Sequence, residues 1–399
     1  MKNERMPAAG YAGLFLICLS ILMFEVAVTR VFSVIMWYHL AFFSISLAMF
    51  GMTLSAVAVT LFPDFFSKEK AGAQTAGSAA LYSISLIAAL FVILHLNIPF
   101  KLSAGAILHL AIVFALLAVP FFFGGLCVTL VLTHNSGSIN KVYFFDLTGA
   151  GAGCLVFIAL MNAAGGMNAI ALTGAAGAAA ALCFSFTSDR SKTTGVAAAV
   201  FAFMLLFTAG NSHFDLLRIR YAKGSPVPKE IFEGWNSFSR VSVNAQREGA
   251  PYLNLNIDEG AATFIPKAEN GEIRHFSTWQ GPPEFPFYVK SYPRVLVIGP
   301  GGGNDVATAW VHGTRDITAV ELNPLIVRIM KTRFADYSGG LYNRKEIQVH
   351  TGDGRAFVER ARGLKWDLIQ LSLVDTFAAT STGALSLSEN SLYTVEAVE

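Results

Sequence analysis

The sequence predicts a multi-pass α-helical membrane domain followed by an α/β domain that begins with a small β-hairpin unit. Hydrophobic residues make up 54% of the chain and charged residues only 14%, which is outside the range of soluble domains. Charge is unevenly spread, since residues 1–212 hold 15 of the 56 Asp, Glu, Lys and Arg residues. In the charged half an apolar run leads into the glycine-rich loop GPGGGND. We therefore divide the chain into a transmembrane domain (1–210), a linker with a small antiparallel β unit (211–290) and an α/β domain (291–399).

The first domain contains seven apolar segments, most of them long enough to cross a hydrocarbon core of about 30 Å as helices. The first segment leads into another span without a small-residue cleavage site, so it is not a cleavable signal peptide. Pro120 lies within an over-long segment and predicts a kink there, or two shorter pieces. The seven segments are 11–36, 40–62, 76–98, 103–133, 142–161, 168–187 and 193–210.

Basic residues flank these spans asymmetrically, which places the N-terminus in the cytoplasm. Seven spans would then put everything after residue 212 outside the cytoplasm, where nucleotide-type cofactors are scarce. We give the cofactor argument more weight than the span count, because one wrongly divided segment reverses the parity. We therefore expect a multi-pass cell-membrane protein with residues 213–399 in the cytoplasm. The basic residues on the N-terminal side are Lys2, Arg5, Lys68, Lys70, Lys141, Arg190 and Lys192, against Lys101 on the other.

Three ionisable residues within the apolar segments each need a partner or water. Arg30 and Asp146 are expected to pair across two helices, with Glu25 as the third such residue; a polar site for substrate or ion is the functional alternative. The small residues of GAGAG at 149–153 predict close helix approach. The four cysteines lie in apolar segments and predict neither disulfides nor metal ligands.

The second half changes to patterns of strands and helices. SRVSVNA and YLNLNID, separated by a turn, predict a hairpin, which ATFI and EIRHF extend into an antiparallel unit around 238–276. Strands and helices then alternate, which predicts a parallel, doubly wound sheet. The expected strands are RVLVIG, DITAVEL, EIQVHTG and WDLIQLSLV, with helices from Asn304, Asn323, Arg355 and near Ser388.

The glycine loop joins the first parallel strand to its helix, where backbone N–H groups and the helix dipole favour an anionic or polar ligand. Gly299, Gly301 and Gly303 permit positive φ and close backbone approach. Glu321 ends the second strand, where a carboxylate accepts ribose hydroxyls, and Asp353 falls where an adenine amino group is recognised. The alternative is a turn that binds no ligand.

These motifs carry a resemblance. RVLVIGPGGGNDV, AVELNP, VHTGDGRAF and WDLIQLSLVDT resemble the spermidine synthase family, a branch of the class I S-adenosylmethionine-dependent methyltransferase fold, which is Rossmann-like. FEVAVTR and VYFFDLTGAGAG resemble its membrane-fused relatives. The resemblance implies a site for S-adenosylmethionine or decarboxylated S-adenosylmethionine, without metal. The positions expected to bind it are Gly299, Gly301, Gly303, Asp305, Glu321, Asp353 and Gly354.

The chain departs from this family at the acceptor site. Soluble members carry two aspartates in a D-S-x-D-P loop after the fourth strand, whereas this chain has Ser372, Asp375 and Thr376. FSTWQG around Gln280 replaces a tyrosine-containing segment, which makes Gln280 the expected substrate-binding residue. Asp375 is the expected catalytic residue, with a capping or structural role as its alternative. Because no acceptor is visible beside Ser372 in QLSLVDT, putrescine is expected to be a poor substrate.

The chain is expected to be a fragment, because the fold needs strands beyond the fourth and Glu399 falls within the helix after LSENSLYT. C-terminal strands of the sheet would then be missing.

Two classes of function remain open. The first is a membrane-anchored aminopropyl- or methyltransferase acting on a small amine or a membrane-proximal acceptor. The second is a transporter or sensor whose soluble domain binds the nucleoside without catalysis; a nicotinamide dehydrogenase ranks third. The expected partners are the lipid bilayer and the acceptor, with a homo-oligomer left open. Nucleic acid is not expected, because the net charge is only +2 and no basic cluster is present.

Overall fold

The chain forms two compact units, Met1–Val227 and Pro228–Glu399, and each is described by itself. The computed structural model describes residues 6–36, 43–98, 103–188, 191–273, 283–361 and 363–372, together with positions 392, 394 and 395. The helix expected near Ser388 lies outside the described residues.

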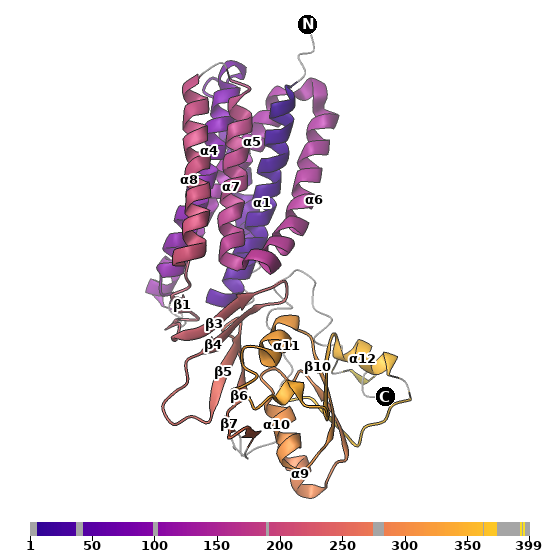
Figure 1. Cartoon of the computed structure of the whole chain (residues 1–399). Helices are drawn as coiled ribbons and strands as arrows, with labels where there is room; N and C mark the ends of the chain where they lie inside the picture. The colour runs from indigo at the N-terminus through magenta and orange to yellow at the C-terminus, as the bar shows by residue number, and fades with distance from the viewer. Residues whose placement is uncertain are drawn as a thin grey trace. The chain divides into compact units, whose positions relative to one another are not determined.

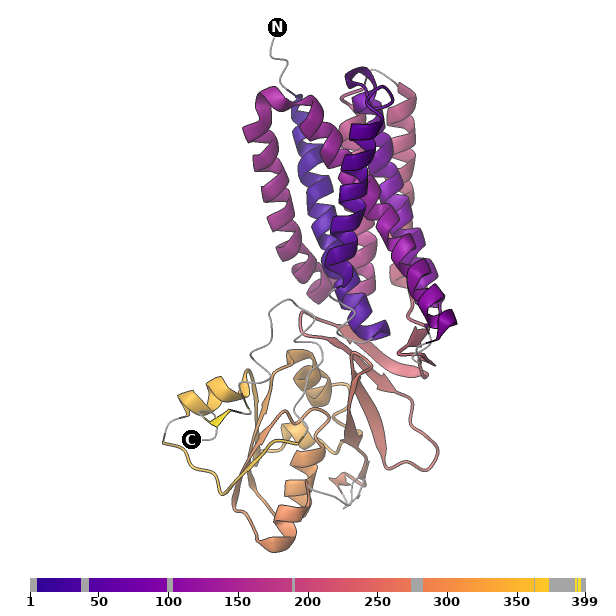
Figure 2. The same cartoon turned by 180° about the vertical axis from the view of Figure 1, so that it is seen from behind.

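The first unit is a bundle of long apolar helices (Figures 1 and 2). Within the described residues seven helices are long and apolar enough to cross a membrane, which confirms the expected number by length and composition. The segment that contains Pro120 is one continuous helix, so the expectation of two shorter pieces is wrong. The helices are α1 (Ala8–Ile35), α3 (Phe43–Leu61), α4 (Lys68–His95), α5 (Ala104–His134), α6 (Ile139–Ala164), α7 (Gly166–Ser185) and α8 (Ser191–Phe214), with a 3-10 turn, η1 (Ser136–Ser138), before α6.

Small residues let α6 approach α1 closely. A Cβ atom added at Gly149 would overlap the carbonyl oxygen of Phe15, and one added at Gly153 would overlap that of Leu19. Gly151, between them, has nothing within 4 Å of such an atom. The close helix approach expected from GAGAG is therefore confirmed, with Gly149 and Gly153 on the contacting face.

Asp146 on α6 has a different partner from the one expected. Its Oδ1 accepts a hydrogen bond from the Cys18 thiol on α1 at 3.0 Å. Arg30 lies twelve residues further along α1, about 18 Å at 1.5 Å per residue, which exceeds the reach of the two side chains. The expected pair of Arg30 with Asp146 is therefore wrong. Arg30 is buried near the other end of α1.

The first unit ends in a short two-stranded ribbon after α8, formed by β1 (Tyr221–Ala222) and β2 (Ser225–Pro226). The start of α1 and the end of α8 lie at opposite ends of the bundle (Figures 1 and 2). An odd number of spans requires this arrangement.

The second unit begins with an antiparallel sheet of four strands in the order β3-β4-β5-β6. The expected hairpin is confirmed, because β4 and β5 pair antiparallel and β6 extends them. Of EIRHF, only Glu272 and Ile273 are described, and they pair with a short strand. The strands are β3 (Glu230–Trp235), β4 (Arg240–Asn244), β5 (Tyr252–Ile257), β6 (Ala261–Pro266), β7 (Ala268–Glu269) and β8 (Glu272–Ile273).

Strand β3 was not expected, because it precedes the antiparallel unit predicted around residues 238–276 and contains two glutamates. In the structure those glutamates pair with Arg240 on β4, whose side chain is only 1% exposed. Its guanidinium lies 2.6 Å from Glu230, 2.9 Å from Glu233 and 2.8 Å from Glu259. A buried charge is tolerated when it is paired in this way, so Arg240 holds the polar strand on the sheet.

A second sheet follows, with four parallel strands in the order β11-β10-β9-β12. The expected alternation of strands and helices is confirmed, although β12 is shorter than its apolar run and α12 begins one residue before Arg355. The elements are α9 (Phe285–Val289), β9 (Arg294–Ile298), α10 (Asn304–Val311), β10 (Asp316–Glu321), α11 (Pro324–Lys331), η2 (Leu341–Asn343), β11 (Ile347–Thr351), α12 (Gly354–Arg360) and β12 (Leu368–Gln370).

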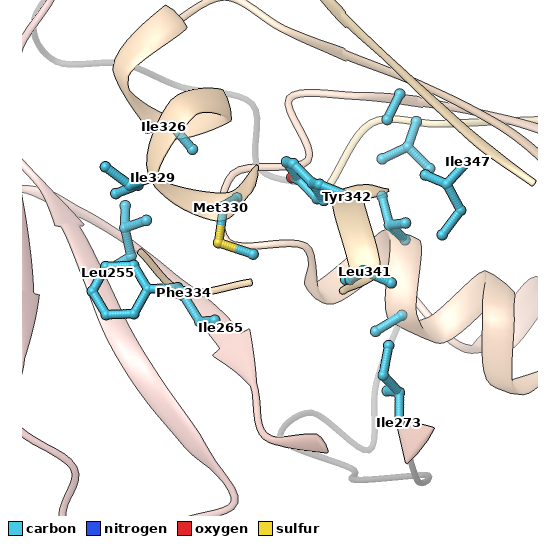
Figure 3. Close-up of a cluster of buried hydrophobic side chains, with 14 of the residues drawn as sticks. Leu255, Ile265, Ile273, Ile326, Ile329, Met330, Phe334, Leu341, Tyr342 and Ile347 are labelled. Atoms are coloured by element: carbon cyan, nitrogen blue, oxygen red, sulfur yellow. The ribbon is translucent and has the colours of Figure 1, made fainter. Parts of the chain in front are cut away.

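Alternate residues of β9 face two different cores. Val295 and Val297 belong to a cluster that joins the parallel sheet, α10, α11 and the antiparallel sheet. Leu296 and Ile298 pack on the other face, against residues of α12. In the first cluster Met330 of α11 lies among Leu255, Phe334 and Tyr342 (Figure 3). The apolar run of β9 is thus explained by burial on both faces of a parallel sheet.

Candidate functional site

The carboxyl ends of the four parallel strands lie at one edge of the sheet. From β9 the chain continues to β10 and β11 on one side, whereas β12 lies on the other, so strand order reverses between β9 and β12. Open α/β sheets bind ligands outside the carboxyl ends of their strands at such a reversal. The residues at these ends follow the order Asp353, Glu321, Gly299 and Ser372, across three strand spacings of about 14 Å in total.

The glycine loop between β9 and α10 adopts backbone conformations that favour glycine. Gly299, Gly301 and Gly303 have φ of 68°, 53° and 94°. A Cβ atom at Gly302 would overlap the carbonyl oxygen of Phe264 on β6. A side chain also holds the loop in place, because the Tyr342 hydroxyl donates to the carbonyl oxygen of Gly301 at 2.8 Å. The glycines therefore allow a tightly packed loop of fixed shape.

Glu321 lies beside this loop with both carboxylate oxygens engaged. Oε2 accepts from the backbone N–H of Gly301 at 3.0 Å, and Oε1 accepts from that of Asn323 at 2.9 Å. The side chain is 6% exposed; burial raises the pKa of its carboxyl group, and the backbone N–H donors lower it in part. Each carboxylate oxygen accepts more than one hydrogen bond, so ribose recognition by Glu321 remains compatible with these contacts and stays a prediction.

Asp353 caps α12. Its Oδ1 accepts from the backbone N–H of Ala356 at 2.8 Å, which satisfies one of the unpaired donors of the first turn. A Cβ atom added at the adjacent Gly354 would overlap the Ile298 side chain of β9, so glycine lets α12 approach the sheet. Both residues therefore have a structural role, and their contact with adenine stays a prediction.

Asp305 and Ser372 come together at the other end of the edge. The Ser372 hydroxyl lies beside the Asp305 carboxylate, and the Asn304 side-chain amide donates to that carboxylate at 3.3 Å. Asp305 is 6% exposed, and burial raises the pKa of its carboxyl group, although these two polar neighbours lower it in part. The segment QLSLVDT shows no acceptor beside Ser372, whereas the fold brings Asp305 of α10 next to it.

Gln370, the last residue of β12, was not identified from the sequence. Its Nε2 donates to the Pro283 carbonyl at 3.2 Å and to the Ser372 hydroxyl at 3.3 Å. Its Oε1 is buried and has no donor in the part of the chain that the structure describes. The only hint in the sequence was that Gln370 is a polar residue within the apolar run LIQLSLV.

Two expected site residues, Asp375 and Gln280, lie outside the described residues. In the described ranges no group of three His, Cys, Asp or Glu side chains could hold a metal ion. The four cysteines are free thiols.

Comparison with known proteins points to one family of enzymes. The chain is 30% identical over 84 residues to a polyamine aminopropyltransferase of Korarchaeum cryptofilum, covering 21% of this chain and 26% of that protein. It is 34% identical over 83 residues to polyamine aminopropyltransferase 2 of Hyperthermus butylicus, covering 21% and 27%. No protein-family model matches the chain. The match thus spans about a quarter of each of these relatives, and it supports a spermidine synthase-like domain in this chain.

Proposed function

We propose that this chain is a membrane protein whose second unit is a Rossmann-type transferase domain for S-adenosylmethionine or its decarboxylated form. The transferred group is aminopropyl or methyl, and the acceptor is an amine. The observation that carries the proposal is the hydrogen bond from Gly301 to Glu321, which holds the glycine loop against a buried carboxylate at the reversal of strand order. The similarity to two polyamine aminopropyltransferases supports it independently.

The order of residues along the sheet edge suggests how the donor would lie. Asp353 and Gly354 would contact the adenine, Glu321 would accept from the ribose hydroxyls, and the loop of Gly299, Gly301 and Gly303 would lie against the amino-acid part. Asp305 would then face the sulfonium end. Three carboxylates on this edge suit a ligand that carries positive charge.

The bound donor supplies a carbon attached to positively charged sulfur; the acceptor nitrogen bonds to this carbon while the C–S bond electrons return to sulfur. For this reaction the chain must hold the nitrogen in line with the C–S bond, exclude water, and accept a proton from the amine. The carboxylates at the carboxyl ends of the parallel strands would provide the proton acceptor. The domain would meet its donor on the cytoplasmic side of the cell membrane.

Product analysis tests the proposal. The full-length protein in lipid nanodiscs is incubated with either donor and a panel of amines, and the nucleoside products are separated. Methylthioadenosine would show aminopropyl transfer, and S-adenosylhomocysteine would show methyl transfer. Binding of the donor with neither product would contradict the transferase and favour a transporter or sensor. Absence of donor binding would overturn the nucleoside site altogether.

A further inference from the structure

We propose that Asp305, Ser372 and Gln370 form the binding site of the attacking amine, with Asp305 accepting its proton. This inference rests on the proposed transferase function and assigns its acceptor site to residues of this chain. The loop after β12 has Ser372 where a carboxylate is expected. In this proposal Asp305 on α10 supplies the carboxylate instead.

Parallel pairing of β12 with β9 brings the three residues together. Gln370 is in register with Val297, so Ser372, two residues further on, is level with the start of the glycine loop. α10 begins directly after that loop and carries Asp305 in its first turn. Residues 67 positions apart in the sequence therefore meet beside the expected sulfonium end of the donor.

The hydrogen bonds form a row with a fixed direction. The Pro283 carbonyl can only accept, so it fixes the Gln370 amide nitrogen toward itself, and that nitrogen also donates to Ser372. The Ser372 hydroxyl accepts from Gln370 and keeps its own hydrogen for an acceptor, and the Asp305 carboxylate lies beside it. All donors in the row are used, and the row is left with acceptors only.

One acceptor of this row lacks a donor. The Gln370 side chain is 6% exposed, and its Oε1 is buried without a hydrogen bond among the described residues. A buried acceptor of this kind is unfavourable unless a ligand donates to it. No lysine, arginine or histidine in the described ranges forms an ion pair with Asp305. An amine can donate an N–H to Gln370 Oε1 and place its positive charge beside the Asp305 carboxylate.

The proton balance of the step is as follows. A protonated amine gives one proton to the Asp305 carboxylate and gains a lone pair. That pair forms the N–C bond, the C–S electrons go to sulfur, and the product leaves as a secondary ammonium ion. Because burial raises the pKa of Asp305, the gap to the pKa of the amine is smaller than for an exposed aspartate.

Binding and kinetics of Asp305→Asn in the full-length protein test this inference. Asp305→Asn keeps the shape of the side chain and removes the base. We expect kcat/KM for putrescine to fall about 100-fold or more, with loss of the acidic limb of the pH profile. Affinity for S-adenosylmethionine should fall less than affinity for putrescine, because Glu321 and the glycine loop still hold the donor. The double variant Asp305→Asn, Ser372→Asp should have a kcat/KM for putrescine about tenfold higher than that of Asp305→Asn alone. The control is Asp316→Asn at the exposed start of β10, which should behave as the unmodified protein.

The outcomes separate this inference from the transferase proposal. Unchanged putrescine kinetics in Asp305→Asn would overturn the amine site, and loss of S-adenosylmethionine affinity would move Asp305 to the donor site. If the unmodified protein forms no product, calorimetric titration with putrescine in the presence of S-adenosylmethionine decides. Binding that weakens tenfold or more in Asp305→Asn and in Gln370→Leu supports the site without catalysis. Equal binding by all variants, or none by the unmodified protein, overturns it.

Discussion

The Glu321 carboxylate at the end of β10 accepts a hydrogen bond from the backbone N–H of Gly301 at 3.0 Å, although twenty residues separate them. The same carboxylate accepts from Asn323 at the start of the next helical segment. One buried side chain thus fixes the glycine loop and the turn after β10, which are the two segments that would hold the donor.

Replacing Glu321 should weaken donor binding. Glu321→Ala removes the acceptor for the ribose hydroxyls and also frees the Gly301 N–H, and each buried group left without a partner costs about 1–3 kcal/mol. We expect the Kd for S-adenosylmethionine to rise at least tenfold in a calorimetric titration. Asp316→Ala, at the other end of the same strand, is the matched control and should retain the affinity. Equal affinity of Glu321→Ala and the unmodified protein would remove the nucleoside assignment.

The second unit should become more stable as the pH falls from about 8 toward 5. Burial raises the pKa of Glu230, Asp305 and Glu321, so the folded state binds their protons more readily than the unfolded state. Their stabilising contribution is complete below the ordinary carboxyl pKa and is lost as the pH rises through the folded pKa, with a slope of at most about 1.4 kcal/mol per pH unit for each group.

Denaturant titration in detergent at several pH values, followed by tryptophan emission, measures this dependence. The emission reports mainly the second unit, which contains four of the five tryptophans. Glu321→Gln should flatten the slope, because the amide does not titrate. A free energy of unfolding that rises with pH across this range would contradict the prediction.

Close packing of α6 on α1 should tolerate larger side chains at one glycine and not at another. Gly153→Leu would force the carbonyl of Leu19 away, and the lost helix contact should destabilise the bundle by about 1–3 kcal/mol. Gly151→Leu is the matched control on the same helix, because nothing lies within 4 Å of its Cβ position. Thermal aggregation of detergent-solubilised protein should show a lower midpoint for Gly153→Leu alone, and equal midpoints would argue against the contact.

The sidedness of the bundle can be measured directly. α1 begins and α8 ends at opposite ends of the bundle, so an N-terminal reporter and one fused after Asp215 should give opposite signals. We expect the cytoplasmic signal after Asp215 and after Ser291. The basic residues that follow α8 favour the same side; they are Arg218, Arg220 and Lys223. With seven spans the N-terminus is then outside, against the cytoplasmic N-terminus expected from the basic residues that flank the spans. A cytoplasmic N-terminus with both later fusions outside would separate the second unit from its proposed donor.

Local sequence patterns determined the helices and most of the strands. Long apolar segments can be satisfied in lipid only as helices, and an apolar run between turn residues forms a strand wherever both of its faces are covered. The pairs that make the site depend instead on strand order. β12 lies beside β9, which places Ser372 against Asp305, and no local pattern records which strand becomes a neighbour.

Strand β3 shows that local sequence patterns also fail to predict where charged residues are buried. Its glutamates predict a solvated linker as long as the sequence is considered alone, because burying them unpaired is unfavourable. In the fold Arg240 lies across from them, at 2.6 Å from Glu230 and 2.9 Å from Glu233, and compensates that charge within the sheet. The sequence therefore determined which segments are apolar enough to be buried. Only the tertiary structure decided which charges are buried with them, because the desolvation of one side chain is offset by a partner that folding brings near.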